Sequence, residues 1–178
     1  MTRQPKTRQQ TKAETRLALI DAGVAEFGRH GFDVSLDQIC ARAKLTRGAF
    51  YVHFADREAF IVAVMHHVMG GFVNVLTGPL DAKLAIRLFI AAIRARAPVV
   101  SGGSGLRFHH VLEACRRSKA IAAAYREVVA KARVALVASV PDGVADMLIA
   151  IALGMLAANE IEIPMQLDHL EKAMLALV

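Results

Sequence analysis

The residues best suited to chemistry lie close together at positions 46–54, which read T-R-G-A-F-Y-V-H-F. Threonine hydroxyl and arginine guanidinium groups can donate hydrogen bonds to base edges or phosphates. Glycine and alanine beside them let the backbone approach a partner closely. We expect Thr46, Arg47 and Tyr51 to touch a nucleic acid and His53 to reach a phosphate, while the two phenylalanines face the core together.

Other reactive residues form no catalytic motif. The sequence contains no G-x-S-x-G, P-loop or dinucleotide-binding glycine motif. His109, His110, Glu113 and Cys115 suggest a metal site, but adjacent histidines on a helix point about 100° apart and cannot easily share one ion. We therefore expect no enzymatic activity, no metal and no cofactor.

The elements that must position the 46–54 segment are helical. Apolar residues recur at i, i+3, i+4 and i+7 almost throughout, and alternating β-branched runs are missing. Helices are expected at about 11–29, 36–43, 47–53, 56–75, 81–96, 106–117, 119–139, 143–159 and 165–177. The predicted fold is all-α, with a three-helix DNA-binding domain at 1–55 and a helical bundle at 56–178 for ligand binding and dimerisation.

Local signals mark several helix ends. Residues 11–14 (T-x-x-E) and 35–38 (S-x-x-Q) have the spacing of capping boxes. Thr46 and Asp56 are the expected N-caps of the third and fourth helices, and Gly31 is expected to stop the first. Two short helices joined by about three residues, behind a longer first helix, have the layout of a helix-turn-helix.

The charge distribution agrees with a polyanionic partner. The net charge is +6. Residues 1–16 contain five basic residues and one acidic residue, and such an arm can follow a phosphate backbone. Two cysteines without a disulfide framework fit a reducing cytoplasm. The uncharged run between Glu58 and Asp81 contains His, Gly, Asn and Pro, so we expect a buried connecting helix and no membrane span.

Four linked motifs resemble the tetracycline-repressor (TetR) family over about residues 12–62. They are F-G-R-H-G-F at 27–32, S-L-D-Q-I-C at 35–40, A-K-L-T-R-G-A-F-Y-V-H-F at 43–54 and D-R-E-A-F at 56–60. The resemblance implies a helix-turn-helix regulator whose later helices bind a small effector and form a dimer. The expected DNA-binding residues are Ser35, Lys44, Thr46, Arg47, Gly48, Ala49, Tyr51, His53 and Arg57.

Three positions depart from the family pattern. Lys44 stands where glycine is usual, and a left-handed backbone there costs a non-glycine residue about 1–2 kcal/mol. Its ammonium could instead be directed at a phosphate. Cys40 replaces alanine and is expected to be buried. Arg57 replaces lysine and keeps the positive charge at the start of the fourth helix.

The second half is expected to hold the dimer interface and a ligand pocket. The helix at 143–159 is apolar on nearly every face, so a partner subunit should cover residues 143–177, and a charge at Leu148 or Met155 should split the dimer. The expected pocket residues are Phe89, Ile93, Phe108, Leu112, Tyr125 and Met155. A loop at 98–105 could gate entry for an apolar or amphipathic effector.

These features predict a cytoplasmic, ligand-responsive regulator, most simply a repressor. It would bind a palindromic operator in double-stranded DNA as a homodimer and be released by a small apolar effector. Three alternatives remain open at the level of sequence. They are an architectural DNA-binding protein without an effector, a small helical enzyme, and an adaptor that binds only protein.

Overall fold

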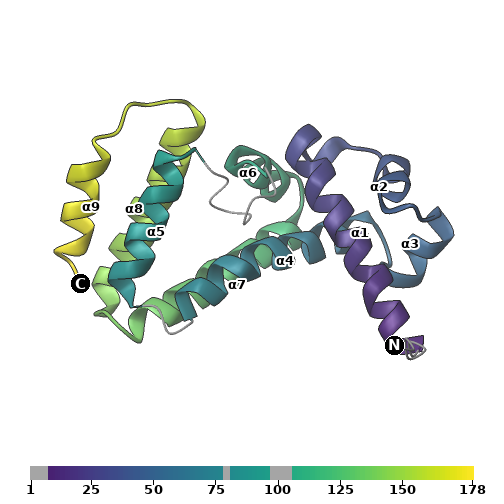
Figure 1. Ribbon diagram of the computed structural model, residues 1–178, viewed down its shortest axis with the longest axis horizontal. Coiled ribbons are helices and arrows are strands. Elements are labelled where there is room, and N and C mark those ends of the chain that lie inside the picture. The colour runs from purple at the N-terminus through teal and green to yellow at the C-terminus, as the bar shows by residue number, and fades with distance from the viewer. Residues whose placement is uncertain (1–7, 78–80, 97–105) are drawn as a thin grey trace, which may run out of the picture.

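The computed structural model describes residues 8–77, 81–96 and 106–178, and within these ranges the chain is helical with no β-strand (Figure 1). The all-α prediction is confirmed. In chain order the elements are α1 (Arg8–His30), a short 3-10 turn η1 (Gly31–Asp33), α2 (Leu36–Ala43), α3 (Arg47–His53), α4 (Arg57–Thr77), α5 (Ala82–Arg94), α6 (Phe108–Arg117), α7 (Lys119–Val137), α8 (Asp142–Glu160) and α9 (Leu167–Leu175).

Most helix boundaries follow the predicted signals, with one clear exception. The capping box expected at 11–14 is wrong, because α1 already begins at Arg8 and Thr11 lies inside it. Thr15 Oγ1 donates to the carbonyl oxygen of Thr11 at 2.8 Å, as hydroxyls inside helices do. Arginine and glutamine are good helix formers, so residues 8–10 extend the helix upstream of the apparent cap.

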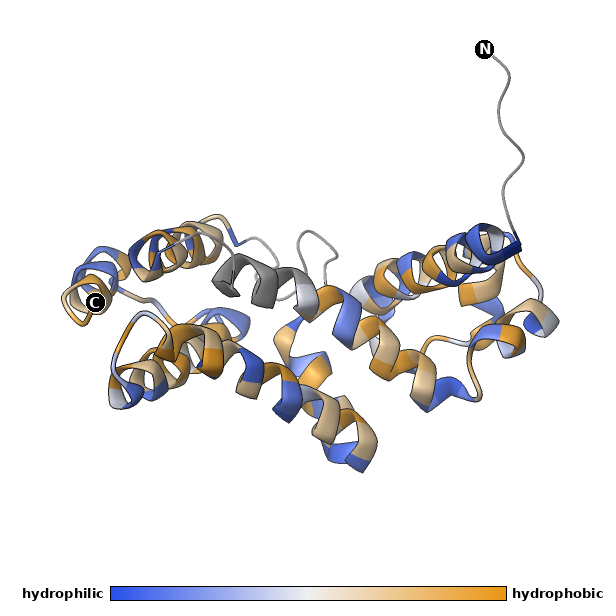
Figure 2. Ribbon diagram, turned by 90° about the horizontal axis from the view of Figure 1, so that it is seen from below, coloured by the Kyte–Doolittle hydropathy of each residue, from blue (hydrophilic) through white to orange (hydrophobic). Residues whose placement is uncertain are grey.

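The helices form two connected groups (Figure 1). α1, α2 and α3 lie at one end, α5, α8 and α9 at the other, and α4 and α7 run side by side between them. Phe27, Phe50 and Phe60 are fully buried in a core shared by α1–α4, α6 and α7. A second core lies among α5, α8 and α9. Figure 2 shows the hydrophobic residues of these helices in orange.

Two features inside the first core fix how α1 packs. Gly23 lets α1 approach α4, since a Cβ atom there would lie 2.5 Å from the ring of Phe60. Glu26 is the one charged residue that is buried within the described ranges, and its carboxylate pairs with Arg42 of α2. A buried charge must be paired, so this contact holds α2 against α1.

One helix among the described residues, α8, is long and apolar enough to cross a membrane by length and composition alone. Only 17% of its most apolar window is buried inside the subunit. Core and interface helices of globular proteins have the same composition, so α8 needs a covering surface but not a membrane.

Candidate nucleic-acid interface and ligand cavity

The helix-turn-helix is held by local hydrogen bonds at each end of its turn. Ser35 Oγ accepts from the backbone of Gln38 at 3.3 Å, and Gln38 Oε1 accepts from the Ser35 backbone at 3.0 Å, which confirms the second capping box. Lys44 adopts the left-handed conformation, with φ 55° and ψ 40°. Thr46 Oγ1 then caps α3 by accepting from Ala49 N at 3.2 Å.

One face of α3 is buried in the subunit and the opposite face is exposed to solvent. Phe50 is fully buried and Phe54 is 4% exposed, as predicted. Tyr51 is 57% exposed on the opposite side. A Cβ atom at Gly48 would meet nothing closer than Thr46 Oγ1 at 3.7 Å. Packing within the subunit therefore does not require glycine at position 48, and the backbone of α3 is open there.

Arg47, the first residue of α3, is not a free cation. Its Nε lies 2.6 Å from Asp37 Oδ1, and its Nη2 donates to Asp37 Oδ2 at 3.0 Å. Asp37 lies in the first turn of α2, so the pair bridges the two helices across the turn. Sequence reasoning missed Asp37, because its approach to Arg47 depends on the angle between α2 and α3.

His53 and Arg57 differ from their predicted placement. The Nδ1 atom of His53 is buried and has no hydrogen-bond partner among the residues that the structure describes. Burial lowers the pKa of this imidazole, helped by Lys12 and Arg16. The guanidinium of Arg57 donates to the carbonyl oxygens of Phe32 and Val34, which ties α4 to the segment before α2. Burial lowers the pKa of Arg57.

The structure brings most of the expected DNA-binding residues onto one surface formed by α2, the turn and α3. The exposed members are Ser35, Lys44, Thr46, Arg47, Gly48 and Tyr51, with Ala49 and His53 partly buried. Arg57 points inward and is left out of the DNA contacts proposed below. The basic residues Arg3 and Lys6 of the predicted arm lie outside the described residues.

An apolar cavity lies in the second half of the molecule, where α5, α7 and α8 meet. Its empty volume is about 920 Å³, including the part open to solvent. It is lined by Met69, Ala82, Ala85, Ile86, Phe89, Tyr125, Val128, Val129, Ala132, Leu136, Leu148, Ile149, Ala152, Leu153, Leu156 and Met174. The part of this space that water-sized spheres can occupy measures about 110 Å³.

Two of the six predicted ligand residues, Phe89 and Tyr125, line this cavity. The other four predictions are not supported. Ile93 and Met155 are buried in the core between α5, α8 and α9, and Phe108 is buried in the first core. Leu112 is 42% exposed on α6, which packs against η1, α7 and α8. The predicted gate at 98–105 lies outside the described residues.

Among the described residues that line the cavity, Tyr125 is the one with a polar side chain. Burial raises the pKa of its phenol to about 12, so the hydroxyl is neutral. No other residue in the described part of the chain forms a hydrogen bond with this hydroxyl. The described lining thus offers a ligand one hydrogen-bonding side chain, in apolar surroundings where such a bond is strong.

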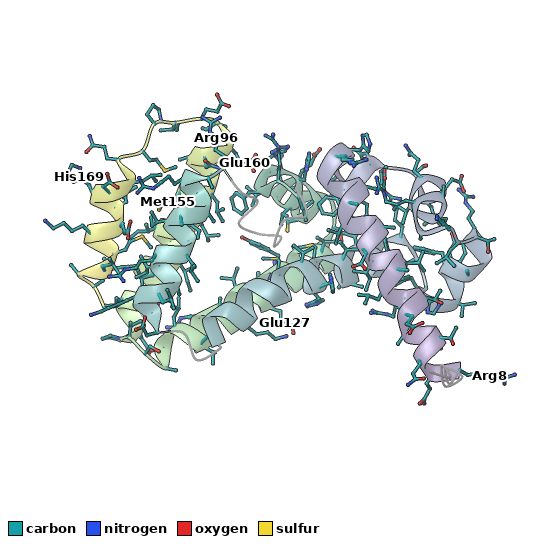
Figure 3. All side chains as sticks on the ribbon, viewed as in Figure 1. Arg8, Arg96, Glu127, Met155, Glu160 and His169 are labelled. Atoms are coloured by element: carbon teal, nitrogen blue, oxygen red, sulfur yellow. The ribbon has the colours of Figure 1, made fainter. Side chains whose placement is uncertain are left out.

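α6 connects the two ends of the molecule. At its start the carboxylate of Glu160, the last residue of α8, accepts from Phe108 N at 2.8 Å and lies 2.7 Å from His109 Nδ1 (Figure 3). At its end Arg117 donates to Asp33 of η1 at 2.7 Å. Glu160 supplies a cap that Arg107, the N-cap residue, does not provide.

One face of α8 is uncovered in the single subunit. Met147 is 50% exposed and Ile161 is 71% exposed. Ala150, Gly154 and Ala157 are exposed on the same helical stripe between them. Leu148 and Met155, the positions at which a charge was expected to split a dimer, are each 4% exposed and face the subunit's own core. The uncovered stripe replaces them as the candidate contact surface.

Comparison with known proteins agrees with this arrangement. The family model "Bacterial regulatory proteins, tetR family" matches residues 19–64. The chain is 36% identical to the A-factor receptor protein of Streptomyces griseus over 59 residues, which are 33% of this chain and 21% of that protein. It is 43% identical over 53 residues to TtgW, an HTH-type transcriptional regulator of Pseudomonas putida, covering 29% of this chain and 40% of that one.

The matched regions thus span about a fifth and two fifths of these relatives' lengths. A solved transcriptional regulator from Streptomyces coelicolor A3(2) has the same fold over 92% of this chain and 98% of its own, with a TM-score of 0.74 and 18% identity. TtgW and the Streptomyces coelicolor protein are both named transcriptional regulators. The chain is thus similar to TetR-type regulators in its N-terminal sequence, over residues 19–64, and to a solved regulator in its overall helical fold.

Proposed function

We propose that this protein is a transcriptional regulator that binds a palindromic operator as a homodimer and is released by a small apolar effector. The observation that carries the DNA-binding part is the surface of α3. Thr46 and Arg47 lie exposed at the start of this helix. The backbone at Gly48 is uncovered, and the side chain of Tyr51 is exposed. A recognition helix needs such a polar, small and exposed face to enter the major groove.

In vitro selection of duplex DNA from a random library tests this function. The wild-type protein should enrich a sequence with two inverted half-sites, centred about 34–36 Å apart or a multiple of it. Arg47→Ala should weaken binding to that duplex by about 1–3 kcal/mol, and Tyr51→Phe should show whether the phenol contributes. If both variants bind as tightly as the wild type, α3 is not the recognition helix.

The effector part of the proposal rests on the cavity. The described residues of its lining carry no charged side chain, so an ionic ligand would lose its hydration there without compensation. An uncharged, largely apolar molecule with one hydrogen-bonding group for Tyr125 fits this lining best. α4 connects the cavity to the DNA-binding helices, because Met69 lines the cavity and Arg57 at its start is bonded to the residues before α2.

The uncharged fluorophore N-phenyl-1-naphthylamine is a suitable probe for this cavity. It should bind with increased fluorescence, and Ala132→Leu, which fills part of the space, should weaken binding. Ala91→Leu on the exposed face of α5 is the matched control and should bind the probe like the wild type. Saturating probe should lower affinity for the selected duplex by about 5–150-fold. Unchanged DNA affinity with bound probe would contradict the effector role.

A dimer and a cytoplasmic location complete the proposal. The uncovered apolar stripe of α8 supports the dimer, since a second copy would remove it from water. A regulator that acts on the chromosome must work in the compartment that contains it. The two-domain division at residues 55 and 56 remains a proposal, because α4 takes part in the first core and also lines the cavity.

A further inference from the structure

A carboxylate from α2 holds the guanidinium that opens α3. The contact has two points, Nε to Oδ1 at 2.6 Å and Nη2 to Oδ2 at 3.0 Å, so it fixes the plane of the guanidinium as well as its position. We propose that Asp37 is a positioning residue that sets the DNA sequence specificity of this protein by aligning Arg47 for one guanine. The inference rests on the DNA-binding function proposed above.

The donors of Arg47 divide between two partners. A guanidinium has five N–H groups, and the pair with Asp37 uses Nε–H and one hydrogen of Nη2. The remaining hydrogens, two on Nη1 and one on Nη2, lie on the end of the side chain. This edge can donate to O6 and N7 of guanine, the commonest specific arginine contact in the major groove. Asp37 can therefore hold the side of the guanidinium while guanine binds its end.

Stability does not explain the pair. The side chains of Arg47 and Asp37 are 59% and 68% exposed, and ion pairs this exposed contribute little to folding. An uncompensated acid on a DNA-facing surface would repel phosphates. When Asp37 pairs with Arg47, the two charges neutralise each other. The electrostatic attraction between Arg47 and any DNA phosphate is therefore weaker. Affinity for random DNA is lowered, and the choice of base depends more strongly on Arg47.

The test compares Asp37→Asn with the wild type on two duplexes of equal length at one salt concentration. The first is the duplex selected by the wild-type protein and the second has a random sequence. Asp37→Asn should lower the ratio of the two affinities roughly tenfold, within the range of one bidentate base contact. Selection repeated with the variant should lose its guanine preference at one position in each half-site.

Two controls separate positioning from general electrostatics and from folding. In an Arg47→Ala background, Asp37→Asn should change the affinity ratio by less than about twofold, because the contact through which Asp37 acts is gone. Thermal unfolding of Asp37→Asn should match the wild type.

The inference is overturned if Asp37→Asn keeps or raises the affinity ratio, or if it changes the ratio equally with and without Arg47. A wild-type protein that binds DNA but shows no guanine preference at any selected position would also overturn it, while leaving the DNA-binding function in place. A wild type that enriches no sequence would overturn the DNA-binding function itself and this inference with it.

Discussion

At the scale of single residues, two glycines that both have open space around them in the subunit have different expected roles. Gly48 and Gly143 are each the second residue of a helix, α3 and α8 respectively. A Cβ atom at Gly143 would meet nothing within 4 Å, and one at Gly48 would make only an ordinary contact at 3.7 Å. The subunit needs neither glycine, so any requirement must come from a partner.

Gly48→Ala and Gly143→Ala should therefore differ in their effect on DNA affinity but not in their effect on the free energy of unfolding. Alanine is a better helix former than glycine, and each change should raise the free energy of unfolding by up to about 1 kcal/mol. Only Gly48→Ala should weaken binding to the selected duplex, because its methyl group meets DNA at close approach. Denaturant unfolding and fluorescence anisotropy measure the two effects, and equal DNA affinities would show that α3 does not approach closely at residue 48.

Two partly buried histidines make stability depend on pH. Burial lowers the pKa of His110, with His109 adding to the effect, and burial also lowers that of His53. Below about pH 6.5 the imidazoles of the unfolded chain take up protons that the folded chain resists. The unfolded state then binds more protons, so the free energy of unfolding falls as the pH decreases.

His110→Gln should reduce the decrease in the free energy of unfolding that occurs at low pH. The measurement is urea unfolding at about pH 7.5 and about pH 5.5, on either side of the ordinary histidine pKa. The change in free energy between the two pH values should be smaller in the variant, whatever its absolute stability. An equal pH dependence in His110→Gln would show that this imidazole is not responsible.

At the scale of elements, α6 takes its N-terminal cap from a neighbouring helix. Its own N-cap residue makes no side-chain cap, and the carboxylate of Glu160 takes that role from α8. A carboxylate is unfavourable at the C-terminal end of its own helix but favourable at the N-terminal end of another. At the far end of α6, the contact between Arg117 and Asp33 of η1 connects this helix to the segment between α1 and α2.

Glu160→Ala should destabilise the protein by about 0.5–2 kcal/mol, the usual cost of a lost N-cap. Amide hydrogen exchange should accelerate first in the opening turn of α6. Glu162→Ala is the matched control, because within the described ranges its exposed carboxylate pairs only with Arg96, at 3.4 Å. If the two variants are equally stable, the carboxylate of Glu160 does not cap α6.

The sequence predicted where helices begin and end better than it predicted which helices pack against each other. α2 and α3 begin and end where expected, because Ser35, Lys44 and Thr46 mark their ends with side-chain and backbone caps. The cavity lining was harder, since periodicity tells which face of a helix is apolar but not which helix covers it. Leu112 is apolar yet exposed, and the contacts of Gly23 and Asp37 depend on helix packing that the sequence does not encode locally.

At the scale of the whole molecule, the uncovered stripe of α8 predicts the mode of assembly. Gly154 lies in the middle of this stripe, and a Cβ atom there would meet nothing of its own subunit within 4 Å. Gly154→Glu should therefore leave the subunit folded but place a charge in the interface, where an unpaired buried charge costs several kcal/mol.

Sedimentation velocity at micromolar concentration should show a dimeric wild type and a monomeric Gly154→Glu variant. Ala91→Glu, on the exposed face of α5, is the control and should remain dimeric. The monomeric variant should also lose affinity for the palindromic duplex, because two half-sites can then no longer be bound together. A monomeric wild type, or a dimeric Gly154→Glu variant, would rule out this interface.

The cavity owes much of its space to alanine. Ala82, Ala85, Ala132 and Ala152 all line it, so at four places the empty volume extends almost to a helix backbone. Replacing any one of them by leucine would fill the space beside that residue. The helix would remain intact, since leucine is also a good helix former. If the proposed effector function holds, single substitutions at these positions should change which compounds bind while the fold stays the same. The same four positions are where an engineer would begin to turn this protein into a sensor for a chosen molecule.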